Sequence, residues 1–336
     1  MLRQALALVL MSALTAQESR PANEILREFE RVAMPGMSEG SDPESVRRFH
    51  EAIVQGSRRK AALALELFES FPDHERVPEL LGARWALLTN AVHENDAVIV
   101  ETSLLLDEAD LRPELRVAAT HARTHAMLLS ERATTAERLR AVRELVQVDR
   151  DSELTGIAIV DLVEDHLADP AMMRPLLAAA QDQWPDSGYV GRPAKRWLAL
   201  LDLVGKPFRD QLPPETRAAF DLATGDPGRF TVVQVWLGWV ATAAGEPEIA
   251  TLRTLRDDGK GDIALVGLYP EFRGSRGEPV PVVIDWPQIG LPGKGAMQSP
   301  FGANRLPIYF VLDDQLRVVT VVGRSATVAS FLHRRS

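Results

Sequence analysis

Cysteine is absent from all 336 residues of the chain. Without a thiol, the protein cannot form a disulfide, present a thiolate nucleophile, or build a zinc–thiolate or iron–sulfur site. The absence does not decide the compartment, because exported and cytosolic chains can both lack cysteine. It excludes classes of chemistry and leaves the location open.

Positive charge is also in short supply. The chain carries 38 Lys and Arg against 47 Asp and Glu, which gives a formal net charge of −9. A nucleic-acid binder needs a basic surface that displaces counterions from phosphates, so we expect no nucleic-acid partner. Hydrophobic residues make up 46% and charged residues 25% of the chain, the balance of a soluble globular protein with room for two domains.

The apolar run near the N-terminus, Ala5 to Leu14, is too short to span a bilayer comfortably. It follows a start with one positive charge, Arg3, and precedes small residues near Ala16 and a polar stretch, which is typical of a secretory signal. We therefore predict a signal peptide over residues 1–20 and an exported, periplasmic or extracytoplasmic protein. Its only predicted membrane contact is an uncleaved signal segment. The alternative is an apolar first helix of a cytosolic protein.

Residues 21–203 have helical periodicity almost throughout, and Asp42 before Pro43 has the composition of a helix start. Turn clusters interrupt the pattern at intervals of roughly 35 to 41 residues, the spacing of helix-pair repeats. These clusters lie at residues 71–74, 111–114, 148–151 and 184–187. We predict an all-α, helical-repeat-like domain here. A helical bundle that merely packs is the alternative.

Two groups of polar residues in this half have the composition of a possible functional site. His121 and His125 are spaced to share one helix face, as in some metal sites, but no third ligand is evident, so we predict solvated histidines and no metal. An acidic cluster near a helix end has the composition of a solvated helix face. Its members are Asp161, Glu164, Asp165 and His166.

The character of the chain changes near Gly205. Short β-branched runs bounded by Gly, Pro and Asp predict strands at residues 230–237, 262–268, 281–285, 307–312 and 316–322. Helical stretches are expected at residues 248–256 and 326–333. A strand–helix–strand unit followed by two adjacent strands and a helix predicts a mixed-sheet α/β domain over residues 204–336.

Four segments of this half follow one another in a familiar order. They are VGKPF at residues 204–208, VWLGWVATAAGEP at 235–247, a strand ending VGL at 266–268, and FGANRLPIYFVLD at 301–313. Together they resemble the thioredoxin superfamily, in particular its exported TlpA-type branch, over about residues 204–336. The resemblance implies a thioredoxin-like fold for this domain.

The same resemblance implies a pair of redox cysteines where this chain has Val240 and Ala243. The segment is also one residue short between the second of these positions and Pro247. In the family, a cysteine at this helix N-terminus exchanges disulfides because its thiolate is stabilised there. Valine and alanine offer no nucleophile, and the hydroxyl of Thr242 has no adjacent base. We therefore expect no thiol chemistry, no catalytic residue and no cofactor.

The resemblance also implies a peptide-binding surface that does not depend on the missing redox cysteines. Leu306–Pro307 would be the cis-prolyl bond beside the lost cysteine pair, in a loop that binds an extended substrate peptide in the family. The predicted binding residues are Trp236, Trp239, Val240, Ala243, Arg305, Leu306 and Pro307. The alternatives are that both tryptophans belong to the core and that Pro307 is a purely structural turn.

Three functions follow. The first is a non-catalytic binding or adaptor module for a protein or extended peptide. The second is a structural relic that supports the helical half. The third is a metal- or cofactor-dependent enzyme that uses His121, His125 or the acidic cluster. We rank the binding module first because the frame of the domain is retained while its nucleophiles are lost.

Overall fold

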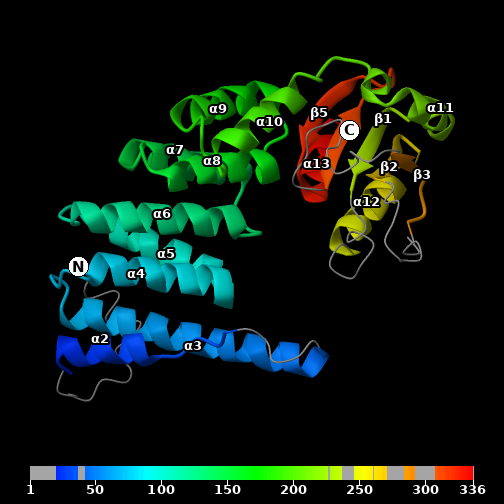
Figure 1. Ribbon diagram of the computed structural model, residues 1–336. Helices are drawn as coiled ribbons and strands as arrows, with labels where there is room; N and C mark the ends of the chain where they lie inside the picture. The colour runs from blue at the N-terminus through cyan, green and yellow to red at the C-terminus, as the bar shows by residue number, and fades with distance from the viewer. Residues whose placement is uncertain are drawn as a thin grey trace. The chain divides into compact units, whose positions relative to one another are not determined.

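The computed structural model describes residues 20–36, 42–225, 228–236, 246–259, 261–270, 284–291 and 307–335 (Figure 1). In chain order the elements are α2 (Ala22–Arg31), α3 (Pro43–Ser70), α4 (Val77–Leu87), the π-helix η1 (Leu88–Val92), α5 (Asn95–Leu106), α6 (Pro113–Leu129), α7 (Thr135–Val148), α8 (Glu153–His166), α9 (Pro170–Gln183), α10 (Gly191–Leu201), the 3-10 helix η2 (Phe208–Gln211), α11 (Pro214–Ala223), β1 (Phe230–Val235), α12 (Glu246–Asp258), β2 (Ile263–Pro270), β3 (Gln288–Leu291), β4 (Ile308–Leu312), β5 (Val318–Val322) and α13 (Ser325–His333). Within the described ranges, no helix is both long and apolar enough to cross a membrane. The predicted signal peptide lies outside them, apart from Arg20. The chain divides into two compact units, Met1–Thr155 and Gly156–Ser336, which we describe separately.

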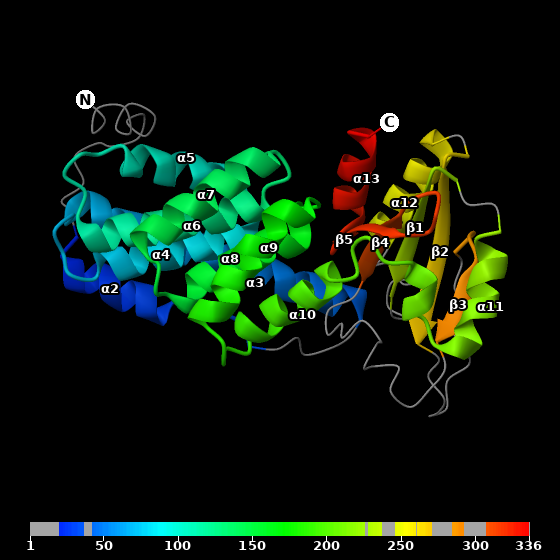
Figure 2. The ribbon, with the colours of Figure 1, turned by 90° about the horizontal axis from the view of Figure 1, so that it is seen from above.

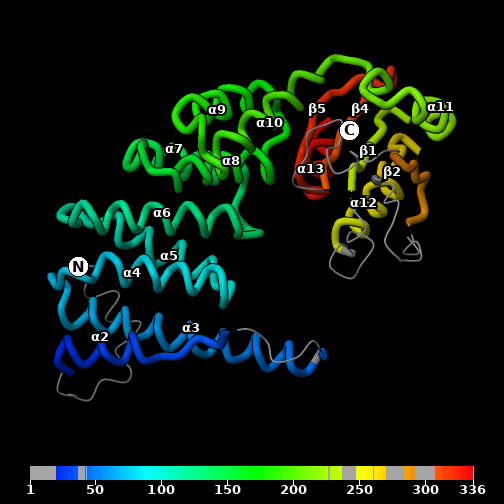
Figure 3. Tube along the Cα trace, in the orientation of Figure 1, coloured from blue at the N-terminus to red at the C-terminus, as the bar shows by residue number. Residues whose placement is uncertain are grey.

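The first unit consists of helices in its described part. Neighbouring helices pack on one another, α2 on α3, α3 on α4, α5 on α6 and α6 on α7, and α4 also packs on α6 (Figure 3). Their apolar faces meet in one core in which Leu63, Leu67 and Trp85 are almost fully buried. The apolar positions that mark helical faces in the sequence are thus the core positions of this unit.

The predicted interruptions coincide with turns between helices. Each interval between them holds two α-helices: α4 and α5, with η1 between them, then α6 and α7, then α8 and α9. Near their starts, α4 and α6 both carry the sequence Pro-Glu-Leu, at residues 78–80 and 113–115. Proline suits the first turn of a helix, where its missing N–H would have no partner. The repeat-like spacing in the sequence therefore corresponds to successive helix pairs.

Local capping explains where two of these helices begin. The Asp42 side chain accepts hydrogen bonds from the N–H groups of Glu44 and Ser45 at 3.1 and 2.9 Å, which confirms the predicted start of α3. Thr134 and Glu137 form a reciprocal capping box at the start of α7.

The two histidines of α6 are half-buried, not fully solvated as predicted. His121 Nε2 lies 2.7 Å from Asp149 Oδ2, and His125 Nε2 lies 2.9 Å from Asn90 Oδ1. Burial lowers the pKa of His125. In the part of the chain that the structure describes, no group of three or more His, Asp or Glu side chains is arranged to hold a metal.

The second unit contains a five-stranded mixed sheet in the order β3-β2-β1-β4-β5. Strands β1, β2 and β3 are parallel, and β4 runs antiparallel to both β1 and β5. Helix α12 connects β1 to β2, and α13 follows β5. The predicted layout of strand, helix, strand, two adjacent strands and helix is confirmed, and with it the mixed-sheet α/β class.

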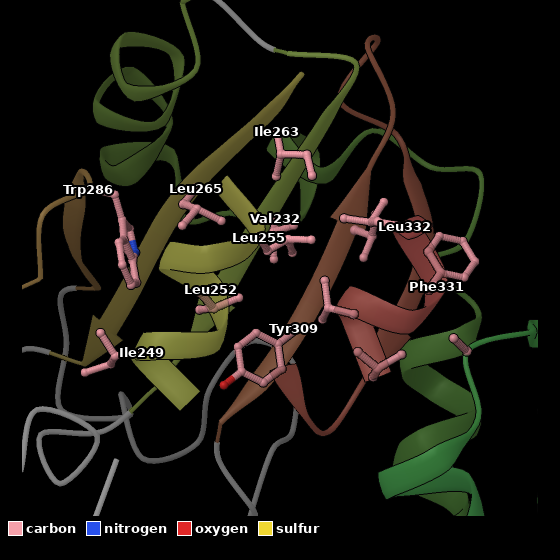
Figure 4. Close-up of a cluster of buried hydrophobic side chains, with 14 of the residues drawn as sticks. Val232, Ile249, Leu252, Leu255, Ile263, Leu265, Trp286, Tyr309, Phe331 and Leu332 are labelled. Atoms are coloured by element: carbon pink, nitrogen blue, oxygen red, sulfur yellow. The ribbon is translucent and has the colours of Figure 1, made fainter. Parts of the chain in front are cut away.

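Helices cover both faces of this sheet. On one face, α12 and α13 pack through a buried cluster that includes Leu252 of α12 and Tyr309 of β4 (Figures 2 and 4). Because neighbouring residues of a strand point to opposite faces, Phe310 lies on the other face. There its ring contacts Phe208 of η2, which in turn contacts Phe220 of α11, at centroid distances of 5.0 and 5.5 Å.

The C-terminus of α8 is bonded to the residues that follow β5. The N–H of Gly323 donates to the carbonyl of Glu164 at 2.9 Å, and Thr327 Oγ1 donates to the carbonyl of Asp165 at 2.5 Å. We call this contact the α8 joint. The last four carbonyls of a helix lack partners within the helix. The α8 joint supplies partners for two of them.

The acidic side chains at this point are buried, which overturns the prediction of a solvated helix face. Glu164 and Asp165 are only 3% and 8% exposed. Glu164 Oε1 accepts hydrogen bonds from Trp197 Nε1 and Arg196 at 2.5 and 3.0 Å, and Asp165 Oδ2 pairs with Arg324 at 2.6 Å. A carboxylate can be buried when it is paired in this way. These partners come from distant parts of the chain.

The compact units do not divide where the secondary structure changes character. The change falls near residue 204, the predicted domain boundary, whereas the second unit begins at Gly156 and includes most of α8 with α9 and α10. Ala168 belongs to the buried cluster of the sheet, and its carbonyl accepts a hydrogen bond from Thr320 Oγ1 at 2.6 Å. The residues after α8 thus contribute to the core of the sheet domain.

One predicted strand is described only at its end, and one strand of the sheet was not predicted. Residues 281–283 of the predicted strand 281–285 lie outside the described residues, and residues 284 and 285 are not in a strand. The sheet also contains β3, which was not predicted; its four residues begin after Pro287 and include Gly290. Helix α11 was not predicted either. β3 is short and contains Gln and Gly, which are weak strand signals, whereas α11 begins at Pro214 and is rich in alanine, so its sequence did carry a helical signal.

Candidate binding site at the carboxyl end of the sheet

The strand directions bring several functional candidates to one end of the sheet. β1, β2 and β3 all end there because they are parallel, and the antiparallel β4 begins there. We call this the carboxyl end of the sheet. In open α/β sheets, ligands bind outside the carboxyl ends of the strands. The first turn of α12 also lies here, because its Glu248 contacts Tyr309 near the start of β4.

Trp236, which directly follows β1, is held in place by an amide. Its indole Nε1 donates to Gln288 Oε1 at 2.9 Å, and its ring lies 5.7 Å from the ring of Tyr269. Gln288 of β3 reaches over Gly267 of β2, its direct neighbour in the sheet. A Cβ atom at position 267 would lie only 2.0 Å from Gln288 Oε1. The glycine therefore makes room for the amide that orients Trp236.

Glu248 joins three elements at the same end of the sheet. Its Oε2 atom accepts a hydrogen bond from the Tyr309 hydroxyl at 2.7 Å and another from the N–H of Ser325, the first residue of α13, at 2.9 Å. Burial raises the pKa of Tyr309 far above its ordinary value, and the Glu248 carboxylate raises it further. Tyr309 therefore stays protonated and remains a hydrogen-bond donor over the physiological range.

Gln234 is the polar side chain in the middle of this arrangement. It stands directly opposite Tyr309 across β1 and β4, so both side chains lie on the α12 face of the sheet. A contact between this amide and the Tyr309 hydroxyl, too poor in geometry to count as a hydrogen bond, offsets a small part of the rise in the pKa of Tyr309. Gln234 is only 1% exposed, yet neither its Nε2 nor its Oε1 makes a hydrogen bond of good geometry with a described residue.

Of the predicted binding residues, Trp236 and Pro307 are described. Trp236 is 1% exposed and packs in the core cluster, and Pro307 is half-buried immediately before β4. The others lie outside the described residues: Trp239, Val240, Ala243, Arg305 and Leu306. Trp236 and Pro307 lie at the same end of the sheet, and a role of either residue in binding stays a prediction.

Sequence reasoning missed four polar residues at this end of the sheet. They are Gln234, Glu248, Gln288 and Tyr309. A signal for the first was present, because a single amide interrupts the apolar run from Phe230 to Trp236. The other three could not be found, since their contacts depend on which strands and helices become neighbours.

The chemistry of this group is that of hydrogen bonding. Its described side chains offer a neutral amide, an indole, a protonated hydroxyl and one carboxylate already bound by two donors. A nucleophile needs a base within hydrogen-bond reach to be activated. The Tyr309 hydroxyl instead donates a hydrogen bond to the Glu248 carboxylate. Because the pKa of Tyr309 is raised, the carboxylate does not remove the proton of Tyr309 at neutral pH.

No protein-family model and no curated protein matches the chain. Among solved structures, it is similar to a thioredoxin-like protein from Bacteroides caccae ATCC 43185, with 10% sequence identity. The comparison covers 96% of this chain and 97% of that chain, with a TM-score of 0.25. A likeness of that size carries no argument about function. The α/β class of the C-terminal domain therefore rests on its own strand order, and membership of the TlpA-type branch stays a prediction.

Proposed function

We propose that the sheet of the second unit belongs to a cysteine-free, thioredoxin-like module that binds an extended protein segment without covalent chemistry, in an exported protein. One observation carries this proposal: the carboxyl end of the sheet gathers Gln234, Trp236, Glu248 and Tyr309 around the first turn of α12 in a chain that has no thiol. Amide, hydroxyl and carboxylate groups bind polypeptide by hydrogen bonds and need no reactive sulfur.

The residues available support the non-catalytic part of the proposal. Thiol–disulfide exchange requires a thiolate, and the chain contains none. The raised pKa of Tyr309 makes its hydroxyl a donor and not a base. Export is proposed from residues 1–20 alone.

A site-specific crosslinker tests the location of binding in the full chain. Tyr269 is half-buried at the end of β2 beside Trp236. It would be replaced by the photoreactive benzoylphenylalanine, whose first ring is a phenyl ring like that of tyrosine. The matched control carries the same group at Leu222 of α11, which is 86% exposed. The probe is reduced, carbamidomethylated lactalbumin, a permanently unfolded polypeptide.

We expect crosslinking from position 269 and little from position 222, although the control is far more exposed. Equal yields would indicate non-specific contact. No crosslink from position 269, together with no binding of the probe by the unmodified protein, would overturn the proposal.

A scaffold function is the second candidate, and the α8 joint favours it. There the sheet supplies partners to the final carbonyls of α8 and buries two of its carboxylates. On this reading the sheet domain stabilises the helices that precede it. Variants Thr320→Val and Thr327→Val, which remove buried hydroxyl bonds at or beside the joint, should then impair the protein in its host even when probe binding is intact.

A further inference from the structure

The buried amide of Gln234 lowers the stability of the fold. A buried polar group without a hydrogen-bond partner costs about 1–3 kcal/mol relative to a satisfied or apolar one. Directly beside Gln234 in the sheet stand Gly267 and Tyr309, and the neighbouring row on this face is apolar and buried: Val232, Leu265 and Val311. A methionine has about the same length as glutamine and would pack there without any polar atom to satisfy. Folding alone therefore does not account for the amide.

The position of Gln234 in β1 indicates where a partner for the amide would come from. It is the penultimate residue of β1, so it lies one residue from the carboxyl end of the sheet. Tyr309, directly opposite, uses its proton to bind Glu248. The amide thus has both a donor and an acceptor to offer at the end of the sheet where ligands bind in this class of fold.

We infer that Gln234 is a ligand-contact residue, whose amide pairs with one peptide group of an extended segment bound at the carboxyl end of the sheet. This inference rests on the proposed function and names the chemical group that its site binds. A primary amide offers an NH2 group with two N–H donors and a C=O acceptor, so one donor and the acceptor can match the C=O and N–H of a peptide group.

Charge at the site supports the choice of an uncharged group. Glu248 places a carboxylate beside Tyr309, which disfavours a carboxylate or phosphate ligand. Among the described residues, Glu248 is not part of any group of three or more His, Asp or Glu side chains that could hold a metal ion. A neutral peptide group is compatible with this carboxylate and needs both halves of the amide.

The test combines stability and binding in the full chain. In Gln234→Met, the unsatisfied amide is removed, so we expect a higher Tm than that of the wild type. Because a bound peptide group then loses its partner, we expect affinity for fluorescently labelled, carbamidomethylated lactalbumin to fall about tenfold or more.

The matched control is Thr231→Val. Thr231 also lies in β1 and is fully buried with an unpartnered hydroxyl, but it stands near the start of the strand, away from the carboxyl end. This variant should not lose stability, and its affinity for the probe should equal that of the wild type.

The outcomes separate the two proposals. A Gln234→Met protein that melts below the wild type would show that the amide has a structural partner, and it would overturn the inference. Unchanged affinity in Gln234→Met with intact wild-type binding would overturn it as well, while leaving the proposed function in place. Absence of wild-type binding would overturn the proposed function and this inference together.

Discussion

Replacing Gly267 by alanine should break the indole hydrogen bond of Trp236 indirectly, through Gln288. The new Cβ would lie 2.0 Å from Gln288 Oε1 and 2.5 Å from its Cδ, far closer than any real contact. The end of the glutamine side chain can swing away, but the buried indole N–H of Trp236 then loses its acceptor. That loss costs about 1–3 kcal/mol.

A second effect acts in the opposite direction. Replacing glycine by alanine restricts the unfolded chain and stabilises the protein by about 0.4–1 kcal/mol where the backbone allows it. Position 267 lies in a regular strand and does not have a positive φ, so the backbone does allow it. The net expectation for Gly267→Ala is a loss of about 1 kcal/mol.

A double-mutant cycle isolates the cause. In a Gln288→Ala background, the collision and the indole hydrogen bond are both absent, so Gly267→Ala should be neutral or stabilising. Denaturant unfolding gives the free energies, and the indole N–H resonance of Trp236, assigned with Trp236→Phe, reports the bond directly. An equal loss of stability in both backgrounds would refute the reasoning, because the effect would then not pass through Gln288.

Three further predictions concern the second unit. Gly323→Ala places a Cβ 2.5 Å from the carbonyl oxygen of Glu164 and should lower the free energy of unfolding, measured with denaturant, by about 1–3 kcal/mol. The control Gly188→Ala, whose Cβ would have nothing within 4 Å, should be close to neutral. Equal effects of the two substitutions would contradict the close approach at the α8 joint. Thr327→Val should cost about 1 kcal/mol, because its buried hydroxyl bonds to the carbonyl of Asp165; an unchanged Tm would argue against that bond. The raised pKa of Tyr309 means that the folded state holds this proton more tightly than the unfolded state, so its contribution is complete below about pH 10 and is lost as the pH rises above it. Unfolding measured from pH 8 to 11.5 should show this alkaline loss in the wild type and a flatter profile in Tyr309→Phe, and identical profiles would contradict it.

Periodicity predicted the architecture well. The helical repeat spacing, the start of α3 at Asp42, and strands β1, β2, β4 and β5 all follow from local patterns, which reflect what each segment buries. The pattern failed at β3, where four residues beside Pro287 carry too little β-branched character to be recognised.

The burial of charge could not be predicted in the same way. In the sequence, Glu164 and Asp165 look like a solvated acidic face, and they are buried because Arg324 and Trp197 reach them from other elements. The same holds for the carboxyl end of the sheet, where Glu248 and Tyr309 are far apart in sequence and meet only through the topology. A local pattern shows which side chains are polar, but not what they will meet.

The α8 joint also has a consequence for how this protein can diverge. On the helical side, its acceptors are the backbone carbonyls of residues 164 and 165, which every amino acid possesses. On the other side, it depends on a position with no side chain, Gly323, and on the hydroxyl of Thr327. The backbone acceptors themselves tolerate any residue, so the constraint on positions 164 and 165 comes from their buried side chains, which pair with Trp197 and Arg324, while the chain after β5 has to keep a glycine and a hydroxyl. Distant relatives should then share two short segments that are far apart in the chain, the acidic pair near the end of α8 and the glycine with its hydroxyl after β5.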